Sequence, residues 1–108
     1  MKIDNISQMK GGWFIGNFEP SLYKTENFEV GIKKYTKGEY HAPHHHKLST
    51  ELNYLISGLL KANGKLIQPG QIFIFDNFEI AECEFLEDCE LVVVKTASVQ
   101  GDKYENIL

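Results

Sequence analysis

The chain has 108 residues, of which 43% are hydrophobic and 24% charged, and its formal net charge at pH 7 is −4. This length fits one domain with a modest core, and the composition is that of a soluble globular protein rather than a disordered one. The eleven basic residues are scattered along the chain, so no basic patch for nucleic acid is expected.

Membrane and secreted classes are not favoured either. No apolar run approaches the roughly 20 residues of a membrane span, and the first residues, MKIDNISQMKGG, lack the apolar segment of a secretory signal. Cys83 and Cys89 are too few for a disulfide framework and are wrongly spaced for CxxC chemistry. We therefore expect a cytoplasmic protein with reduced cysteines.

The first half of the chain reads as short strands. Residues 13–18 (WFIGNF) are aromatic and β-branched, and they lie between Gly11-Gly12 and Pro20. Residues 27–38 alternate with a period of two and end at Gly38. Residues 1–10 and 98–108 carry the weakest pattern, and we expect both segments to be loosely held or used in dimer contacts.

The second half continues in the same way. Residues 50–70 indicate two strands joined at Asn63-Gly64, which is the strongest short-range signal for a hairpin. In the next strand, IFIF, either the two isoleucines or the two phenylalanines face inward, and residues 78–88 and 90–97 predict two more strands. Seven to nine short strands without a clear helical period predict an all-β sandwich or barrel.

All four histidines lie in one stretch, GEYHAPHHHKLSTELNYLISG (residues 38–58). On a strand, His44 and His46 project from the same face. Glu51 opens the following apolar run, so it can face back toward them from an adjoining antiparallel strand. Two imidazoles and one carboxylate suit Fe, Mn, Ni or Zn and leave coordination positions open. A solvated histidine-rich loop is the alternative interpretation.

The spacing of this stretch resembles the first conserved motif of the cupin superfamily, G-x5-H-x-H-x(3,4)-E-x6-G. Its fixed positions fall on Gly38, His44, His46, Glu51 and Gly58. The resemblance implies an all-β, cupin-type double-stranded β-helix (a jelly-roll barrel) forming a single domain over residues 1–108, with its core at 26–96. It also implies a divalent metal ion bound by His44, His46 and Glu51, whereas His41 and His45 do not match ligand positions.

The second cupin motif, G-x5-P-x-G-x2-H-x3-N, is mostly missing. Counted from Gly70, its later fixed positions fall on Asp76, Phe78, Ala81 and Phe85, so alanine stands where the family usually has a third histidine. On one strand, Glu79 and Cys83 would share the inner face with Ala81. Glu79, Cys83 or a water molecule is therefore the expected substitute.

The pocket is expected to hold a small molecule. Asn53 and Ser57 are in phase with Glu51, and Cys83 would face them across the barrel. Only Lys33 and Lys61 are candidates for inward cations, and both are ambiguous, which argues against a strongly anionic ligand. Apolar residues on both faces of IFIF and LVVV predict that the chain forms a homodimer through its sheets.

Two function classes follow from these residues. The favoured prediction is a metal-dependent enzyme of the isomerase, lyase or dioxygenase type, with Glu79 as general base. The alternative is a non-catalytic module that binds a metabolite as a sensor or accessory protein. Glu79 and Asn53 beside a cavity would favour the enzyme, whereas a barrel filled by Phe73, Phe75 or Phe85 would favour the binding module.

Overall fold

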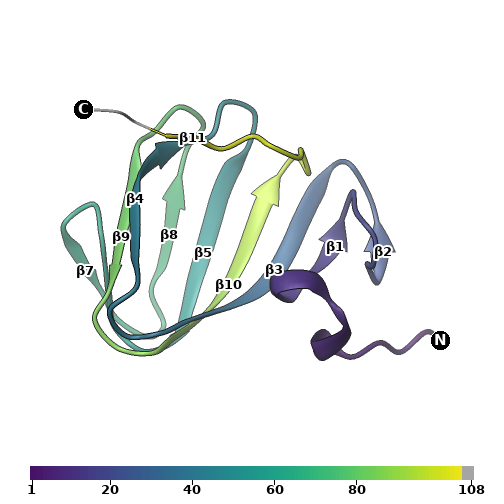
Figure 1. Ribbon diagram of the computed structural model, residues 1–108, viewed down its shortest axis with the longest axis horizontal. Helices are drawn as coiled ribbons and strands as arrows, with labels where there is room; N and C mark the ends of the chain where they lie inside the picture. Colours follow the sequence, from purple (N-terminus) through teal and green to yellow (C-terminus); the bar gives the residue numbers. More distant parts are fainter. Residues whose placement is uncertain (106–108) are drawn as a thin grey trace.

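The computed structural model describes residues 1–105, which form two β-sheets that face each other (Figure 1). The first sheet has the strand order β2-β1-β3-β10-β5-β8: Tyr23–Lys24, Trp13–Gly16, Phe28–Tyr35, Cys89–Thr96, Thr50–Ser57 and Ile72–Phe75. The second has the order β11-β4-β9-β6-β7: Tyr104–Glu105, Tyr40–His45, Ala81–Phe85, Leu60–Ala62 and Lys65–Ile67. All pairings are antiparallel except that of β1 with β2, and the all-β prediction is confirmed.

The predicted hairpin is the connection between β6 and β7. Asn63 and Gly64 have φ values of 50° and 77°, as the tight turn of a two-residue hairpin requires. The Asn63 side chain also accepts a hydrogen bond from the Glu82 N–H at 2.8 Å and donates one to the Ile80 carbonyl at 2.9 Å. The β6–β7 turn is therefore stabilised both by the backbone conformations of Asn63 and Gly64 and by hydrogen bonds to the start of β9.

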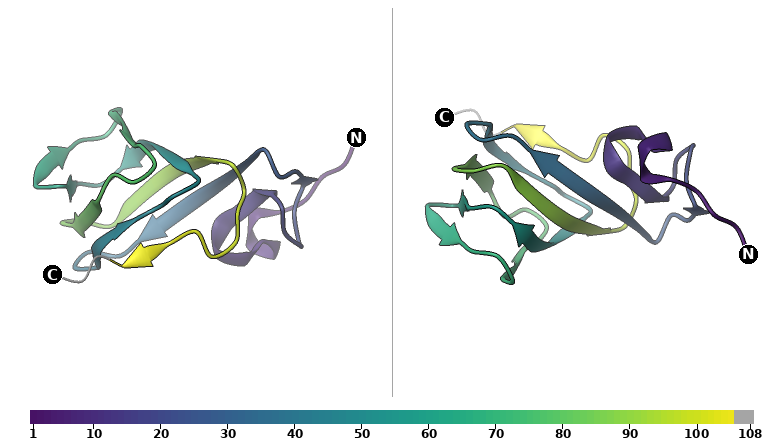
Figure 2. Two further views of the ribbon diagram at one scale, coloured as in Figure 1. Left: turned by 90° about the horizontal axis from the view of Figure 1, so that it is seen from above. Right: turned by 90° about the horizontal axis from the view of Figure 1, so that it is seen from below.

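Both terminal segments add strands outside the predicted core of 26–96. Two short 3-10 helices, Ile6–Gln8 and Lys10–Gly12, precede β1, which pairs with β3. At the other end, residues 97–105 leave β10 in the first sheet and pair as β11 with β4 in the second (Figures 1 and 2). We call residues 97–105 the C-terminal crossing segment. Among residues 1–105, no helix has the length and apolar character needed to span a membrane.

The hydrophobic core lies between the two sheets. Its most buried members are Leu55 and Leu60, with Phe85 and Leu91 packed beside them. Of the two options for IFIF, the structure directs Phe73 and Phe75 inward and leaves Ile72 and Ile74 exposed. Phenylalanine rings therefore cover part of the inner wall next to the histidine stretch.

Strand β3 turns its more polar face to the interior. Glu29 is buried, and Lys33 and Tyr35 line the space between the sheets, whereas Phe28 is exposed on the opposite side. The inner side of this strand thus brings charged and phenolic groups to a cavity, while its apolar side faces outward.

Candidate metal centre

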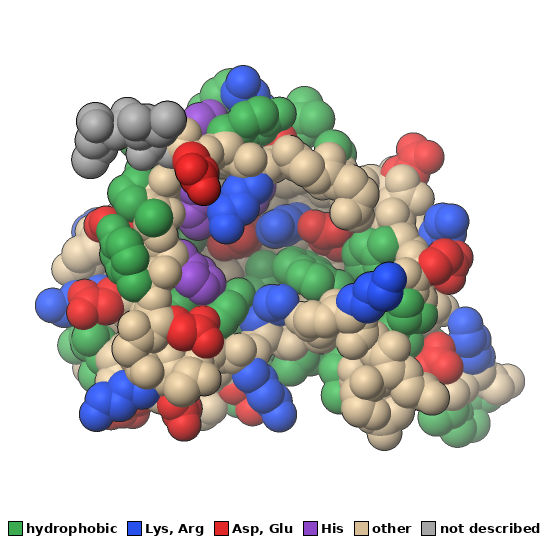
Figure 3. All heavy atoms as spheres, in the orientation of Figure 1, with side chains coloured by type: hydrophobic (Ala, Val, Ile, Leu, Met, Phe, Trp, Pro, Cys, Tyr) green, Lys and Arg blue, Asp and Glu red, His purple; other side chains and the backbone are tan. Residues whose placement is uncertain are grey.

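A cavity of about 220 Å³ lies between the sheets. Its wall holds the histidine pair His44 and His46, together with Glu51 and Asn53, and its floor is formed by core residues such as Leu91. Figure 3 shows the hollow in the middle of the molecule, with histidine, lysine and acidic side chains gathered around it. The open end of the barrel is therefore lined by the residue types that bind metals and small polar ligands.

Strand β4 positions the two histidines. His44 is buried and lies opposite Ala81 in the β4–β9 pairing, and His46 is buried just beyond the end of the strand. Their rings lie 5.6 Å apart between centroids and are nearly perpendicular, at 88°. His44 Nδ1 lies 2.9 Å from the carbonyl oxygen of Ala42. Because a carbonyl only accepts, Nδ1 carries the proton and Nε2 carries the lone pair.

Strand β5 supplies the carboxylate from the other sheet. Glu51 lies between Phe75 of β8 and Lys95 of β10 in the strand pairing. Asn53, two residues along and on the same inner face, donates from Nδ2 to Glu51 Oε2 at 3.2 Å. This hydrogen bond orients the Glu51 side chain along the cavity wall, as a second-layer partner of a metal ligand does.

Asp102 of the C-terminal crossing segment anchors the loop between the histidines and Glu51. Its carboxylate accepts hydrogen bonds from the backbone N–H groups of Lys47, Leu48 and Ser49 at 3.0–3.2 Å. Burial acts to raise the pKa of Asp102, but these hydrogen bonds lower the pKa overall. The loop that carries His46 is thus attached to the segment that crosses the barrel.

Burial favours the neutral forms of two titratable groups in the cavity, His46 and Cys83. Burial lowers the pKa of His46, and the nearby charge of Lys95 lowers it further. Burial also raises the pKa of the Cys83 thiol to about 12, with the Glu51 charge acting in the same direction. Without an ion present, His46 is therefore a neutral imidazole and Cys83 a protonated thiol.

Cys83 and Asn53 lie where the sequence predicted them, in the cavity wall. Cys83 is buried on β9 in phase with Ala81 and Phe85, all three facing the interior. Glu79 does not share this face, and the prediction that it faces the pocket is corrected. Strand β9 begins only at Ala81, so the period of two does not extend back to Glu79.

Glu79 instead belongs to an exposed turn. Its Oε1 accepts from the backbone N–H of Asp76 at 3.0 Å, and its own N–H donates to the Asp76 carbonyl at 3.0 Å. Within this turn Phe78 has a φ of 69°, at the position where the second cupin motif has glycine. The turn survives the loss of its usual residues, but it holds Glu79 away from the cavity.

Ser57 is also outside the cavity. The pairing of β5 with β10 slips by one residue, since Leu55 lies opposite Leu91 while Ser57 lies opposite Glu90. A bulge of this kind reverses the alternation of faces. Ser57 is consequently exposed at the end of its strand, and the prediction that it lines the pocket is corrected.

Several cavity residues were missed or left ambiguous by the sequence interpretation. Tyr35 and His41 line the wall and pack against Phe85, with ring centroids 4.4 and 5.0 Å from it. Lys33, Lys95 and Lys103 also line the cavity. Lys95 is in phase with the buried Leu91 and Val93, a signal that the sequence contains, whereas Lys103 is brought there only by the C-terminal crossing segment.

Comparison by sequence finds no matching family profile and no related curated protein. Comparison of structures finds three informative neighbours. The DMSP lyase DddQ from Ruegeria pomeroyi DSS-3 has a TM-score of 0.70 at 12% identity, over 85% of this chain and 48% of that one. An uncharacterized Klebsiella pneumoniae protein with a double-stranded β-helix domain has a TM-score of 0.67 at 18% identity, over 93% and 88% of the chains.

The third neighbour is a cupin-2 domain protein from Shewanella frigidimarina, with a TM-score of 0.55 at 13% identity, over 69% of this chain and 76% of that one. The chain has the cupin-type double-stranded β-helix fold. It spans about half the length of the DddQ chain, and at these identities the likeness concerns the fold.

The donor set of this cupin barrel fits a divalent ion in its chemistry. His44 offers Nε2, His46 is neutral, and Glu51 supplies the charge that the ion needs. Within residues 1–105, however, no three His, Cys, Asp or Glu side chains are gathered tightly enough to coordinate one ion as they stand. The three side chains share one cavity wall but do not converge on a single point.

Proposed function

We propose that this cupin binds a divalent metal ion through His44, His46 and Glu51 and acts on a small molecule as a metal-dependent enzyme of the isomerase, lyase or dioxygenase type. The observation that best supports this proposal is that the three side chains, which come from two facing sheets, line one cavity. In addition, the contact of His44 with the Ala42 carbonyl fixes the His44 tautomer. Binding would require side-chain rotations that bring the carboxylate toward the imidazoles. The fold shared with a lyase supports an enzyme.

The chain's own residues have distinct parts in this proposal. When bound, the ion would polarise a carbonyl or carboxylate oxygen of the ligand. Asn53 would hold Glu51 in place through its hydrogen bond. Glu79 lies in an exposed turn, so we look for a proton donor or acceptor in the cavity lining, where Tyr35, His41 and Cys83 are candidates beside the lysines. Burial raises the pKa of the Tyr35 phenol, which suits it to donate a proton rather than to remove one.

A non-catalytic binding module is the second candidate, and two observations favour it: Glu79 lies outside the cavity, and three phenylalanines lie in its lining. Phe73, Phe75 and Phe85 all line the cavity, and two of them pack edge to face with centroids 5.8 Å apart. These rings reduce the space for a substrate and supply no acid or base. A sensor or accessory role in the cytoplasm would need only ligand binding, and turnover of a substrate would argue against it.

Elemental analysis tests the metal proposal directly. Untagged protein purified without chelator should contain near-stoichiometric Fe, Mn, Ni or Zn, and the His44→Ala/His46→Ala double variant should lose it, because one carboxylate cannot hold a divalent ion against water. The matched control is His45→Ala, since His45 is stacked on Tyr104 with centroids 5.4 Å apart and does not line the cavity. Equal metal content in the double variant, or none in any protein after ions are added back, would contradict the proposal.

A further inference from the structure

Three lysines line the cavity that holds the proposed metal ligands. Lys33 comes from β3, Lys95 from β10 and Lys103 from the C-terminal crossing segment. Among the described residues of this wall, Glu51 is the single carboxylate. The lining of this cavity therefore has more positive than negative side chains, although Glu29 pairs with Lys95. An excess of one charge in a cleft concentrates ligands of the opposite charge.

Two of the lysines, Lys33 and Lys95, are held in place by contacts within the protein, whereas Lys103 is exposed. The ammonium groups of Lys33 and Lys95 each lie 5.1 Å from the centroid of the Trp13 ring, within the range of a cation–π contact. Lys33 also donates a hydrogen bond to the Gly11 carbonyl. The Trp13 ring can lie here because residue 31 is glycine, where an added Cβ would come within 2.7 Å of it.

The charges beside the Trp13 ring are only partly balanced. Lys95 Nζ lies 3.8 Å from Glu29 Oε1, which neutralises it in part, while Glu29 also accepts from Ser98. Burial, followed by the charge of Lys95, lowers the pKa of Lys33. An anion bound near either ammonium group would offset this unfavourable interaction of like charges.

A second chamber adjoins the first. It has a volume of about 300 Å³ and shares Trp13, His46, Lys95 and Lys103 with the metal-side cavity. Lys95 and Lys103 thus lie at the junction of the two chambers together with His46, whereas Lys33 lines only the metal-side cavity. The second chamber also has carboxylates in its lining, Glu19, Glu29 and Asp102. The metal-side volume of about 220 Å³ is below the roughly 300–1,000 Å³ of pockets for drug-sized ligands, so the ligand has to be small.

We propose that Lys33, Lys95 and Lys103 form a subsite for the anionic group of a small metabolite, a carboxylate or a phosphate, whose other end faces His44, His46 and Glu51. This inference rests on the proposed function and narrows its substrate class to anions. It also revises the sequence expectation that a strongly anionic ligand is not favoured, which considered only Lys33 and Lys61 as inward cations and counted neither Lys95 nor Lys103.

The single tryptophan of the chain gives a direct test, because Trp13 contacts two of the lysines. Metal-free protein at low ionic strength is titrated with pyruvate, with inorganic phosphate and with methyl pyruvate, a neutral ester of nearly the same shape, while Trp13 fluorescence is recorded. We expect a saturable change with pyruvate or phosphate and none with the ester at the same concentrations. Which anion binds more tightly decides between a carboxylate and a phosphate ligand.

Variants then assign the binding to the lysines. Lys33→Met and Lys95→Met should each weaken anion binding about tenfold or more, because methionine keeps most of the stem and removes the charge. Lys61→Met is the matched control, since Lys61 is exposed on β6 and does not line the cavity. Circular dichroism checks the fold of each variant, and Lys103→Met, at an exposed position, provides the same test if a change beside Trp13 unfolds the chain.

Three outcomes would overturn the inference. They are an equal fluorescence response to pyruvate and its ester, an equal loss of anion affinity in Lys61→Met and Lys95→Met, and no saturable response to either anion. The same experiments distinguish a failure of the metal proposal from a failure of the anion subsite. Anion binding through the lysines in a protein that takes up no metal would leave the subsite standing without the metal centre. Metal uptake with no effect of any lysine variant would leave the metal centre without the subsite.

Discussion

At the scale of single residues, Gly58 shows why the last position of the histidine motif is a glycine. Its φ is 95°, in the left-handed region that other residues rarely adopt. A Cβ at this position would lie 2.3 Å from the Asp88 carbonyl oxygen and 2.7 Å from Cys89 Sγ. The β5–β6 connection therefore passes directly against the start of β10, and only a residue without a side chain fits.

Gly58→Ala should consequently lower the free energy of unfolding by about 3 kcal/mol or more, since it adds a backbone clash to the strain of a positive φ. Gly64→Ala is the matched control, because Gly64 also has a positive φ, of 77°, but nothing lies within 4 Å of its Cβ position. Gly64→Ala should lower the free energy of unfolding by only about 1 kcal/mol. Urea unfolding of both variants measures the difference, and equal losses would show that packing against Asp88 is unimportant.

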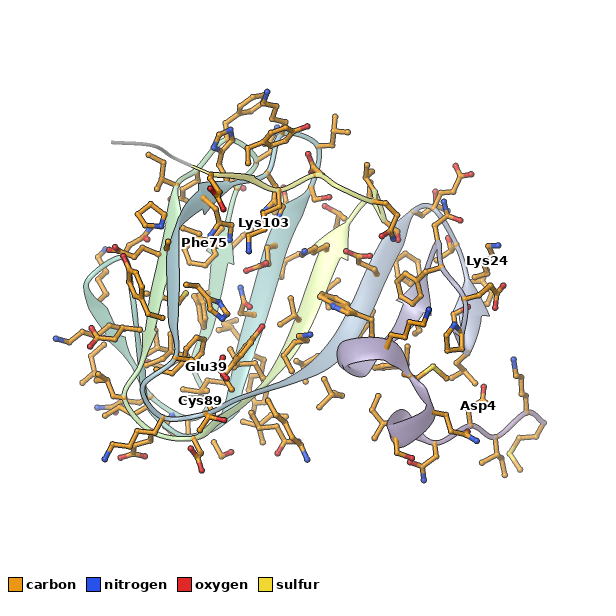
Figure 4. All side chains as sticks on the ribbon, in the orientation of Figure 1. Asp4, Lys24, Glu39, Phe75, Cys89 and Lys103 are labelled. Carbon is orange, nitrogen blue, oxygen red and sulfur yellow. The ribbon has the colours of Figure 1, made fainter. Side chains whose placement is uncertain are left out.

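At the scale of elements, the C-terminal crossing segment joins the two sheets over the cavity. Asp102 is 5% exposed and accepts from three successive backbone N–H groups of the loop after His46. The same segment carries Lys103, which Figure 4 labels near Phe75 at the open end of the barrel. One short segment thus sets the position of both the His46 loop and one of the three cavity lysines.

Asp102→Ala should lower the free energy of unfolding by about 3 kcal/mol, because it removes the acceptor of three backbone donors, those of Lys47 and Leu48 partly buried and that of Ser49 buried. Asp88→Ala is a suitable control: Asp88 is exposed and accepts a single hydrogen bond, from the Lys37 N–H at 2.8 Å, so its loss should cost about 1 kcal/mol or less. Chemical denaturation of both variants compares them. Similar losses would mean that the crossing segment does not hold the loop.

At the scale of the whole molecule, the outer face of the first sheet is apolar. Leu52 and Tyr54 of β5, Ile72 and Ile74 of β8, and the alternate valines Val92 and Val94 of β10 surround one open groove there. Ile72 is 77% exposed and Ile74 49% exposed. Contiguous apolar surface of this kind is typical of an interface, and we propose that a second copy of the chain covers it.

Analytical ultracentrifugation tests this homodimer. The Ile72→Lys/Ile74→Lys double variant should sediment as a monomer at concentrations where the unaltered chain is a dimer, because the two charges would be buried in the interface without partners. Leu66→Lys, at an exposed apolar residue on β7 of the other sheet, should leave the dimer intact. A monomeric unaltered chain would contradict the proposal.

The sequence by itself determined the fold class and much of the candidate centre. Strand periodicity and the Asn63-Gly64 turn are local properties, and they predicted an all-β sandwich or barrel. The resemblance of the spacing from Gly38 to Gly58 to the cupin motif implied the type of barrel and the ligand set His44, His46 and Glu51. Period-two phasing also placed Asn53 and Cys83 correctly, since each lies within a regular strand. These inferences hold because a regular strand fixes side-chain direction from its immediate neighbours.

Only the tertiary structure decided the rest. The bulge near Ile56 turned Ser57 outward, and the late start of β9 put Glu79 in a turn, because irregularities interrupt the alternation that the sequence argument extends. The inward placement of Lys33 depends on which face of β3 meets the cavity, and that of Lys103 on a segment that crosses between the sheets. Such choices are made by packing between distant segments, so they have no signature in the local sequence.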